Sequence, residues 1–84
     1  MTLEEELTIA AGKVRPEAHV WFDRSGPDLI MFWRWTYKNK DLEYSRAEKL
    51  QDYNADYELV GAVVDFCVIQ MGLMEKEIDD TTLS

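Results

Sequence analysis

The sequence has few of the residues that form disulfide frameworks, metal centres or phosphate-binding loops. Its 84 residues include one cysteine, Cys67, and one histidine, His19. A single cysteine excludes an intramolecular disulfide, and one histidine with one cysteine gives no transition-metal ligand spacing. The four glycines form no loop that could cradle a phosphate. We therefore expect neither a metal nor a cofactor.

Basic residues and long apolar runs are also scarce. Nine Lys and Arg residues stand against 17 Asp and Glu residues, which gives a formal net charge of −8. This charge would repel the phosphates of nucleic acids and anionic membranes, so we expect no direct binding to either. The most apolar stretch, residues 59–74, is shorter than the roughly 20 residues that a membrane-spanning helix needs. Glutamates near the N-terminus stand where a signal peptide carries positive charge, which favours a cytoplasmic protein.

Catalytic motifs are absent from the sequence as well. No local motif ties Ser45 or Cys67 to His19, so a nucleophile activated by a histidine is unsupported. Cys67 falls in an apolar pattern, where it would pack as a small hydrophobe. We expect a non-enzymatic protein, and a small enzyme dependent on His19 stays as an alternative.

Two segments carry helical features. Thr2 and Glu5 have the spacing of a capping box, which predicts a helix over residues 2–11. Apolar residues at spacings of four and three predict a long helix over residues 55–77. This apolar seam consists of Val60, Val64, Cys67, Met71, Met74 and Ile78, widened by Leu59, Val63, Phe66 and Leu73. Residues 79–84 have no periodic partner, so we expect a disordered acidic tail there.

Three segments between the helices alternate apolar and polar side chains. They predict strands over residues 17–24, 29–37 and 42–47. Turn-forming residues at 25–28 and 38–41 separate them, so the strands should form an antiparallel meander. Together with the helices they make one α+β domain over residues 1–78.

Two finer expectations concern the third strand. If Asn39 and Lys40 close the second hairpin, Trp35 opposes Tyr44 across the sheet. A single helical turn is expected over residues 46–51, because the capping-box spacing recurs just before it.

Alternation along the strands gives the sheet two different faces. One face should carry Ala18, Val20, Phe22, Leu29, Met31, Trp33, Trp35, Tyr37, Leu42 and Tyr44. This face is apolar enough to form a core, so we expect the N-terminal helix and the long C-terminal helix to cover it. The opposite face is polar, with an apolar island of Trp21, Ile30 and Phe32 that should remain exposed. Such an island favours a protein contact or a homodimer surface.

The acidic charge is concentrated at the two ends of the chain. Residues 1–12 carry three acids and no base, residues 13–49 six acids and eight bases, and residues 50–84 eight acids and one base. Two interpretations stay open: a solvated surface that keeps the protein soluble, or helix carboxylates that imitate a row of backbone phosphates. The candidates for such mimicry are Glu4, Glu5, Asp52, Asp56, Glu58, Asp65, Glu75, Glu77, Asp79 and Asp80.

The element order of helix, three strands and helix resembles that of the double-stranded RNA-binding domain, whose helices also cover one face of a meander. RNA binding in that family depends on a basic cluster at the start of the last helix, where residues 53–58 here read Tyr-Asn-Ala-Asp-Tyr-Glu. The resemblance therefore implies the topology and not the RNA binding. In size, acidity and element order the whole chain is also similar to the small phage-encoded anti-CRISPR proteins that block Cas9. That resemblance implies an inhibitor in the host bacterial cytoplasm and transfers no residue role.

These observations favour a non-enzymatic inhibitor of a nucleic-acid-processing protein, with a CRISPR effector as the leading target. The helix carboxylates would stand where phosphates bind, as in a DNA mimic, and aromatic residues would act as apolar anchors. The alternative is a homodimeric structural or adaptor module that uses the exposed sheet face.

Overall fold

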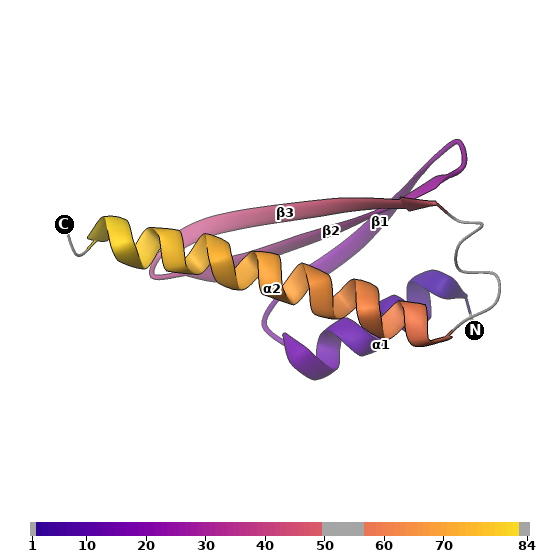
Figure 1. Ribbon diagram of the computed structural model, residues 1–84, viewed down its shortest axis with the longest axis horizontal. Helices are drawn as coiled ribbons and strands as arrows, with labels where there is room; N and C mark the ends of the chain where they lie inside the picture. Colours follow the sequence, from indigo (N-terminus) through magenta and orange to yellow (C-terminus); the bar gives the residue numbers. More distant parts are fainter. Residues whose placement is uncertain (1, 50–56, 83–84) are drawn as a thin grey trace.

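The computed structural model describes residues 2–49 and 57–82, with five elements in these ranges. They are α1 (Leu3–Val14), β1 (His19–Ser25), β2 (Asp28–Tyr37), β3 (Lys40–Lys49) and α2 (Tyr57–Thr82). Figure 1 shows the order helix, three strands, helix, with the strands side by side and both helices on the same side of the sheet. The expected α+β fold is confirmed.

The sheet is an antiparallel meander with the strand order β1-β2-β3. Gly26 begins the first turn with a φ of 58°, the position at which a type II′ hairpin turn has glycine. Lys38 and Asn39 form the second turn with φ values of 50° and 66°. Positive φ at both central residues is the signature of a type I′ turn, whose twist matches that of the flanking strands.

The second turn corrects the expected register. Because the turn is Lys38-Asn39 and not Asn39-Lys40, Trp35 opposes Leu42 instead of Tyr44. The shift is two residues, so the same side chains still share each face.

β3 is longer than expected and overrides the helical turn expected over residues 46–51. It continues to Lys49, which pairs with Asp28 at the start of β2. Pairing with β2 gives these residues a series of interstrand hydrogen bonds. A single helical turn would form fewer backbone hydrogen bonds, so the strand is favoured despite the capping-box spacing. Residues 50 and 51 lie outside the described ranges.

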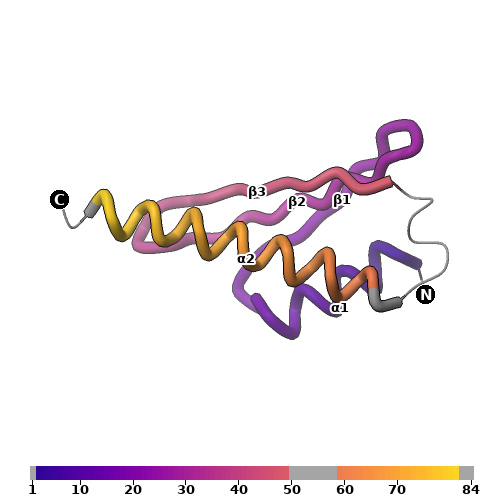
Figure 2. Tube along the Cα trace, in the orientation of Figure 1, coloured from indigo at the N-terminus to yellow at the C-terminus, as the bar shows by residue number. Residues whose placement is uncertain are grey.

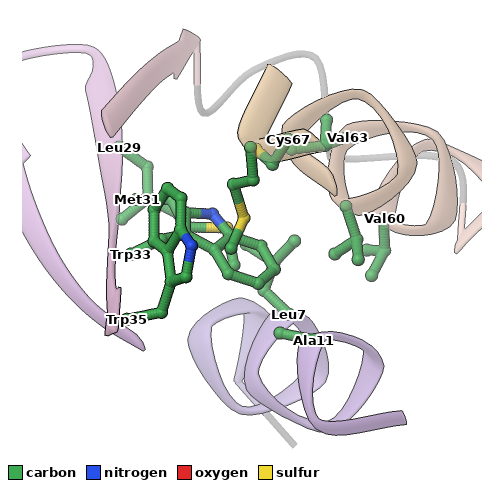
Figure 3. Close-up of a cluster of buried hydrophobic side chains, with 11 residues drawn as sticks. Leu7, Ala11, Leu29, Met31, Trp33, Trp35, Val60, Val63 and Cys67 are labelled. Carbon is green, nitrogen blue, oxygen red and sulfur yellow. The ribbon is translucent and has the colours of Figure 1, made fainter. Parts of the chain in front are cut away.

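The core lies between the sheet and the two helices. It is formed by Leu7, Ala11, Leu29, Met31, Trp33, Trp35, Val60, Val63, Val64, Cys67 and Met71. In Figure 3, Trp33 and Trp35 point from β2 toward the helices, where α1 contributes Leu7 and Ala11. The sheet face expected to be apolar is therefore the covered one.

α1 begins as the sequence predicts and ends later. The backbone N–H of Glu5 donates to the hydroxyl of Thr2 at 3.2 Å, which satisfies one free donor of the first turn. Helical structure continues three residues past the expected end, to Val14. Gly12 therefore lies inside the helix and does not stop it.

α2 also extends beyond its expected end. It reaches Thr82, so residues 79–82 are helical and are not part of a disordered tail. Contacts from Asp79 to the β2-β3 turn, described below, explain the extension. Neither helix within the described residues combines the length and apolarity needed to cross a bilayer.

The outward side of α2 differs from the expected single seam. The sequence pattern predicts Phe66 and Leu73 on the inner side of α2, but these residues are 40% and 55% exposed. Ile69 is 61% exposed on the same side of the helix. α2 thus carries two apolar faces, one on the core and one in solvent.

Candidate protein-binding surfaces

The open face of the sheet carries a group of three stacked rings, the aromatic cluster of His19, Trp21 and Phe32. Trp21 on β1 lies directly opposite Phe32 on β2. Their ring centroids are 5.3 Å apart with an interplanar angle of 4°. The His19 ring stacks on Trp21 at 5.4 Å and 30°. Of the described elements, none lies over this face in Figures 1 and 2.

Strand geometry accounts for the cluster. His19 and Trp21 are two residues apart on one strand, so their side chains point to the same side. Directly opposed aromatic pairs on an antiparallel sheet stabilise it by about 0.2 to 1 kcal/mol. Ile30, two residues before Phe32 on β2, lies on the same face and is half-buried. Trp21, Ile30 and Phe32 therefore share the open face as expected, but all three are half-buried and not fully exposed, and His19 enlarges the group.

Charged side chains surround the aromatic cluster. Alternation places four acids on the open face, Asp23, Asp28, Asp41 and Glu43, and two always-charged bases, Arg34 and Lys49. Arg34 and Asp41 approach each other at 3.9 Å. The rim is polar with a small excess of negative charge.

Glu75 on α2 is partly buried and hydrogen-bonded to residues of two other parts of the chain. The Arg15 guanidinium donates to both of its carboxylate oxygens, at 2.6 and 3.2 Å. The Trp35 indole N–H donates to the same carboxylate at 3.3 Å. The hydrogen bond to Glu75 raises the pKa of Arg15 above its usual value. Because these bonds use its oxygens, Glu75 is a structural residue and a poor phosphate mimic.

Asp79 joins the C-terminal half of α2 to the second hairpin. Its carboxylate accepts from the Tyr37 hydroxyl at 2.8 and 3.0 Å and from the ammonium of Lys38. Hydrogen bonding to Lys38, and then to Tyr37, lowers the pKa of Asp79 below its usual value. The charged form of Asp79 is thus favoured in the folded protein.

Replacing Asp79 with asparagine should reduce the sensitivity of the fold to acid. A carboxyl whose pKa is lowered by folding stabilises the protein above its unfolded pKa, and this contribution is lost as pH falls through the folded pKa. The wild-type melting temperature should therefore fall more steeply than that of Asp79→Asn between about pH 5 and pH 2. Thermal unfolding followed by circular dichroism measures this difference. The Asp80→Asn variant, changed at an exposed neighbour, should behave as the wild type; equal slopes for Asp79→Asn and wild type would contradict the prediction.

The other carboxylates expected to imitate phosphates divide by environment. Glu4 forms an ion pair with Arg24 at 2.6 Å, and Glu5 accepts from the hydroxyl of the helix cap Thr2. Asp65, Glu77 and Asp80 are exposed on α2. Asp52 and Asp56 lie outside the described residues, as does the side chain of Glu58. Among the described candidates, Glu4, Glu75 and Asp79 are thus neutralised by basic partners.

Two observations bear on the residues considered for metal binding and catalysis. Within the described ranges, no group of three or more His, Cys, Asp or Glu residues is placed to hold a metal ion. Cys67 is fully buried in the core, and burial raises the pKa of its thiol. A buried thiol that resists ionisation is a poor nucleophile.

A shallow apolar groove between the two helices was missed by the sequence patterns. It encloses about 400 Å³ between α1 and α2, and its lining includes Ile9, Val14 and Gly61. Val14 fits the inner side of α1 by periodicity, yet it is 48% exposed because α1 ends there. The two helices therefore expose an apolar groove, and neither the charge distribution nor the turn residues of the sequence predict it.

Comparison with known proteins finds one informative similarity. The chain is 33% identical to the arginine–tRNA ligase of Pyrobaculum arsenaticum over 76 residues. The alignment covers 86% of this chain and 12% of that enzyme. No family model and no solved structure matches the chain. The similarity is to a small part of a much longer protein.

Proposed function

We propose that this chain is a non-enzymatic protein-binding domain that holds its partner through the aromatic cluster on the open sheet face. The stacked pair of Trp21 and Phe32, which no described element covers, is the observation that carries the proposal. Large aromatic side chains at the centre of a polar rim are the usual energetic anchors of protein interfaces.

Two features favour a protein over a nucleic acid as the partner. In a platform for single-stranded nucleic acid, aromatic rings offer free faces to the bases. Here Trp21 lies between the rings of Phe32 and His19, so its faces are already occupied and fewer ring faces remain for bases. The acidic excess around the cluster would also repel a phosphate backbone.

The partner we propose is a nucleic-acid-processing protein in the cytoplasm. The chain resembles part of an enzyme whose name assigns it the joining of arginine to tRNA. The net charge of −8 favours contact with a protein surface over contact with the nucleic acid itself.

Capture experiments with matched variants test this proposal. The Phe32→Asp variant places a charge in the stacked pair and should reduce the amount of captured partner at least tenfold. Ile9→Asp makes the same chemical change on α1, outside the sheet face, and should leave capture unchanged. Partners from a cell lysate are quantified by mass spectrometry, and the best is purified for direct titration. Equal capture by wild type and Phe32→Asp, or direct binding of single-stranded RNA to the chain, would overturn the proposal.

A second candidate is an inhibitor that uses the exposed carboxylates as a nucleic-acid mimic, with a CRISPR effector as its target. The exposure of Asp65, Glu77 and Asp80 along α2 favours it. Repeating the titration at about 50 and 500 mM salt separates the candidates. Binding by mimicry should weaken strongly with salt, whereas binding through aromatic anchors should change little.

A further inference from the structure

β3 is an edge strand with a long and regular outer side. It pairs with β2 over its whole length, Lys40–Lys49, without a bulge. No described strand pairs with its other side, and it contains neither proline nor glycine. Natural proteins usually interrupt such edges, because the free backbone groups are a template for another strand.

The hairpin geometry identifies the backbone groups that point to the free edge. Tyr37 and Lys40 flank a two-residue turn, so they form a hydrogen-bonded pair, and the pairs alternate from there. The residues whose N–H and C=O groups face the free edge are Asp41, Glu43, Ser45, Ala47 and Lys49.

A second unpartnered surface, the outer stripe, lies on α2 beside this edge. It consists of Ala62, Phe66, Ile69 and Leu73, all exposed, at spacings of four, three and four. This is the spacing of an apolar seam that packs on another helix. The Arg46 guanidinium of β3 lies 4.0 Å from the centre of the Phe66 ring, so the stripe is next to the edge strand. The groove with α1 is lined by other residues of α2, among them Val60 and Gly61.

Both surfaces are complementary to themselves in antiparallel orientation. In the outer stripe, an antiparallel copy places small Ala62 against large Leu73, and Phe66 against Ile69. The midpoint of this arrangement falls between Cys67 and Val68.

In the strand, an antiparallel copy centred on Ser45 opposes no like charges, although Leu42 then faces Glu48. Asp41 faces Lys49, and Tyr44 faces Arg46, so neither pair brings like charges together. A register centred two residues earlier would place Lys40 against Arg46 and is therefore unfavourable.

The two midpoints coincide along the molecule. Arg46 lies over Phe66, and Leu42 lines the same pocket as Met74 and Ile78. The strand segment from Leu42 to Arg46 is about 13 Å long. It runs beside the helix segment from about residue 76 back to Phe66, which is about 15 Å long. Ser45, one residue from Arg46, is then level with about residue 68 of α2. One twofold axis therefore serves the strand pairing and the helix packing together.

We propose that two copies of this chain associate about that axis. The β3 strands pair antiparallel into one continuous sheet, and the α2 helices pack antiparallel through their outer stripes. The dimer leaves the aromatic clusters of both copies on the same uncovered sheet face. This inference is independent of the proposed function, because the contact uses none of the cluster residues.

Cysteine cross-linking tests the register. In the dimer the two Ser45 Cα atoms are about 5.5 Å apart, within disulfide range, whereas the two Ala47 Cα atoms are about 14 Å apart. Mild oxidation should therefore link Ser45→Cys covalently and leave Ala47→Cys unlinked. Wild-type Cys67 is fully buried and serves as the background. Cross-linking of Ala47→Cys as fast as Ser45→Cys would overturn the register.

Sedimentation over a concentration series tests the association itself. The wild type should show a reversible dimer, and Ile69→Asp should weaken dimerisation at least tenfold by charging the outer stripe. Ile9→Asp removes a similarly exposed isoleucine from α1 and should dimerise as the wild type does. A wild type that remains a monomer at about 0.5 mM would overturn the proposal, since an interface of this kind normally gives affinities in the micromolar range or tighter. A dimer that survives Ile69→Asp unchanged would overturn it equally.

Discussion

Replacing Trp33 with alanine is expected to lower the free energy of unfolding by about 4 kcal/mol. The Trp33 residue is completely buried on β2, in the cluster that includes Leu7 of α1 and Cys67 of α2 (Figure 3). Its removal takes away apolar contact with both helices and leaves a cavity that the sheet backbone cannot close. A domain of 84 residues has a total stability of only about 4 to 13 kcal/mol. The variant should therefore be marginally folded at best.

Urea unfolding followed by circular dichroism measures the effect of Trp33→Ala. Trp21→Ala, which removes the same side chain from the open face, should cost only about 1 kcal/mol. Trp33→Phe keeps a folded reference if the alanine variant is too unstable. Its cost should be smaller than that of Trp33→Ala, because the phenylalanine ring refills part of the space that alanine leaves empty. A larger loss for Trp21→Ala than for Trp33→Ala would contradict the assignment of the core face.

Replacing Glu75 with alanine is expected to cost about 2 kcal/mol. The change leaves the Arg15 guanidinium, whose side chain is 17% exposed, without its bidentate partner. It also removes the acceptor of the Trp35 indole N–H. Breaking a fully buried ion pair costs roughly 3 to 5 kcal/mol, and the remaining contact with solvent places this pair below that range.

A double-mutant cycle isolates the pair. Arg15→Ala alone should also destabilise, and Glu75→Ala with Arg15→Ala should cost less than the sum of the two, by about 1 kcal/mol or more. Glu77→Ala, at an exposed carboxylate two residues along α2, should cost at most about 0.5 kcal/mol. Additive single effects would show that the contact contributes no coupling energy.

The topology could be predicted because its signals are local. Alternation along β1 and β2 and the Gly26-Pro27 turn determine the first hairpin within a few residues of sequence. The sequence predicts the second turn one residue too late, because Lys38-Asn39-Lys40 lacks a glycine to mark the positive φ positions. The face assignment survived, since a two-residue shift preserves alternation.

The ion pairs could not be predicted, because their partners are far apart in sequence. Arg15 and Glu75 are separated by 60 residues, and Lys38 and Asp79 by 41. A carboxylate on a helix looks the same in sequence whether it faces solvent or an arginine from another element. Charge counting therefore grouped Glu75 and Asp79 with exposed residues such as Asp80.

The outer stripe escaped prediction for a different reason. Phe66 and Leu73 lie close enough in helical phase to the inner seam to be counted with it. On a helix that packs on a sheet, one side is covered by strands and another by the neighbouring helix α1. The position of α1 decides which of the remaining apolar residues of α2 stay exposed. The apolar pattern of α2 gives no information about where α1 packs.

The placement of the outermost helix ends has a consequence for joining this fold to other domains. The start of α1 and the end of α2 lie toward opposite ends of the longest axis, along which the molecule extends 46 Å (Figure 2). Domains inserted into a loop of a host protein generally need neighbouring ends. Proteins fused before α1 and after α2 would instead be held apart by most of this length.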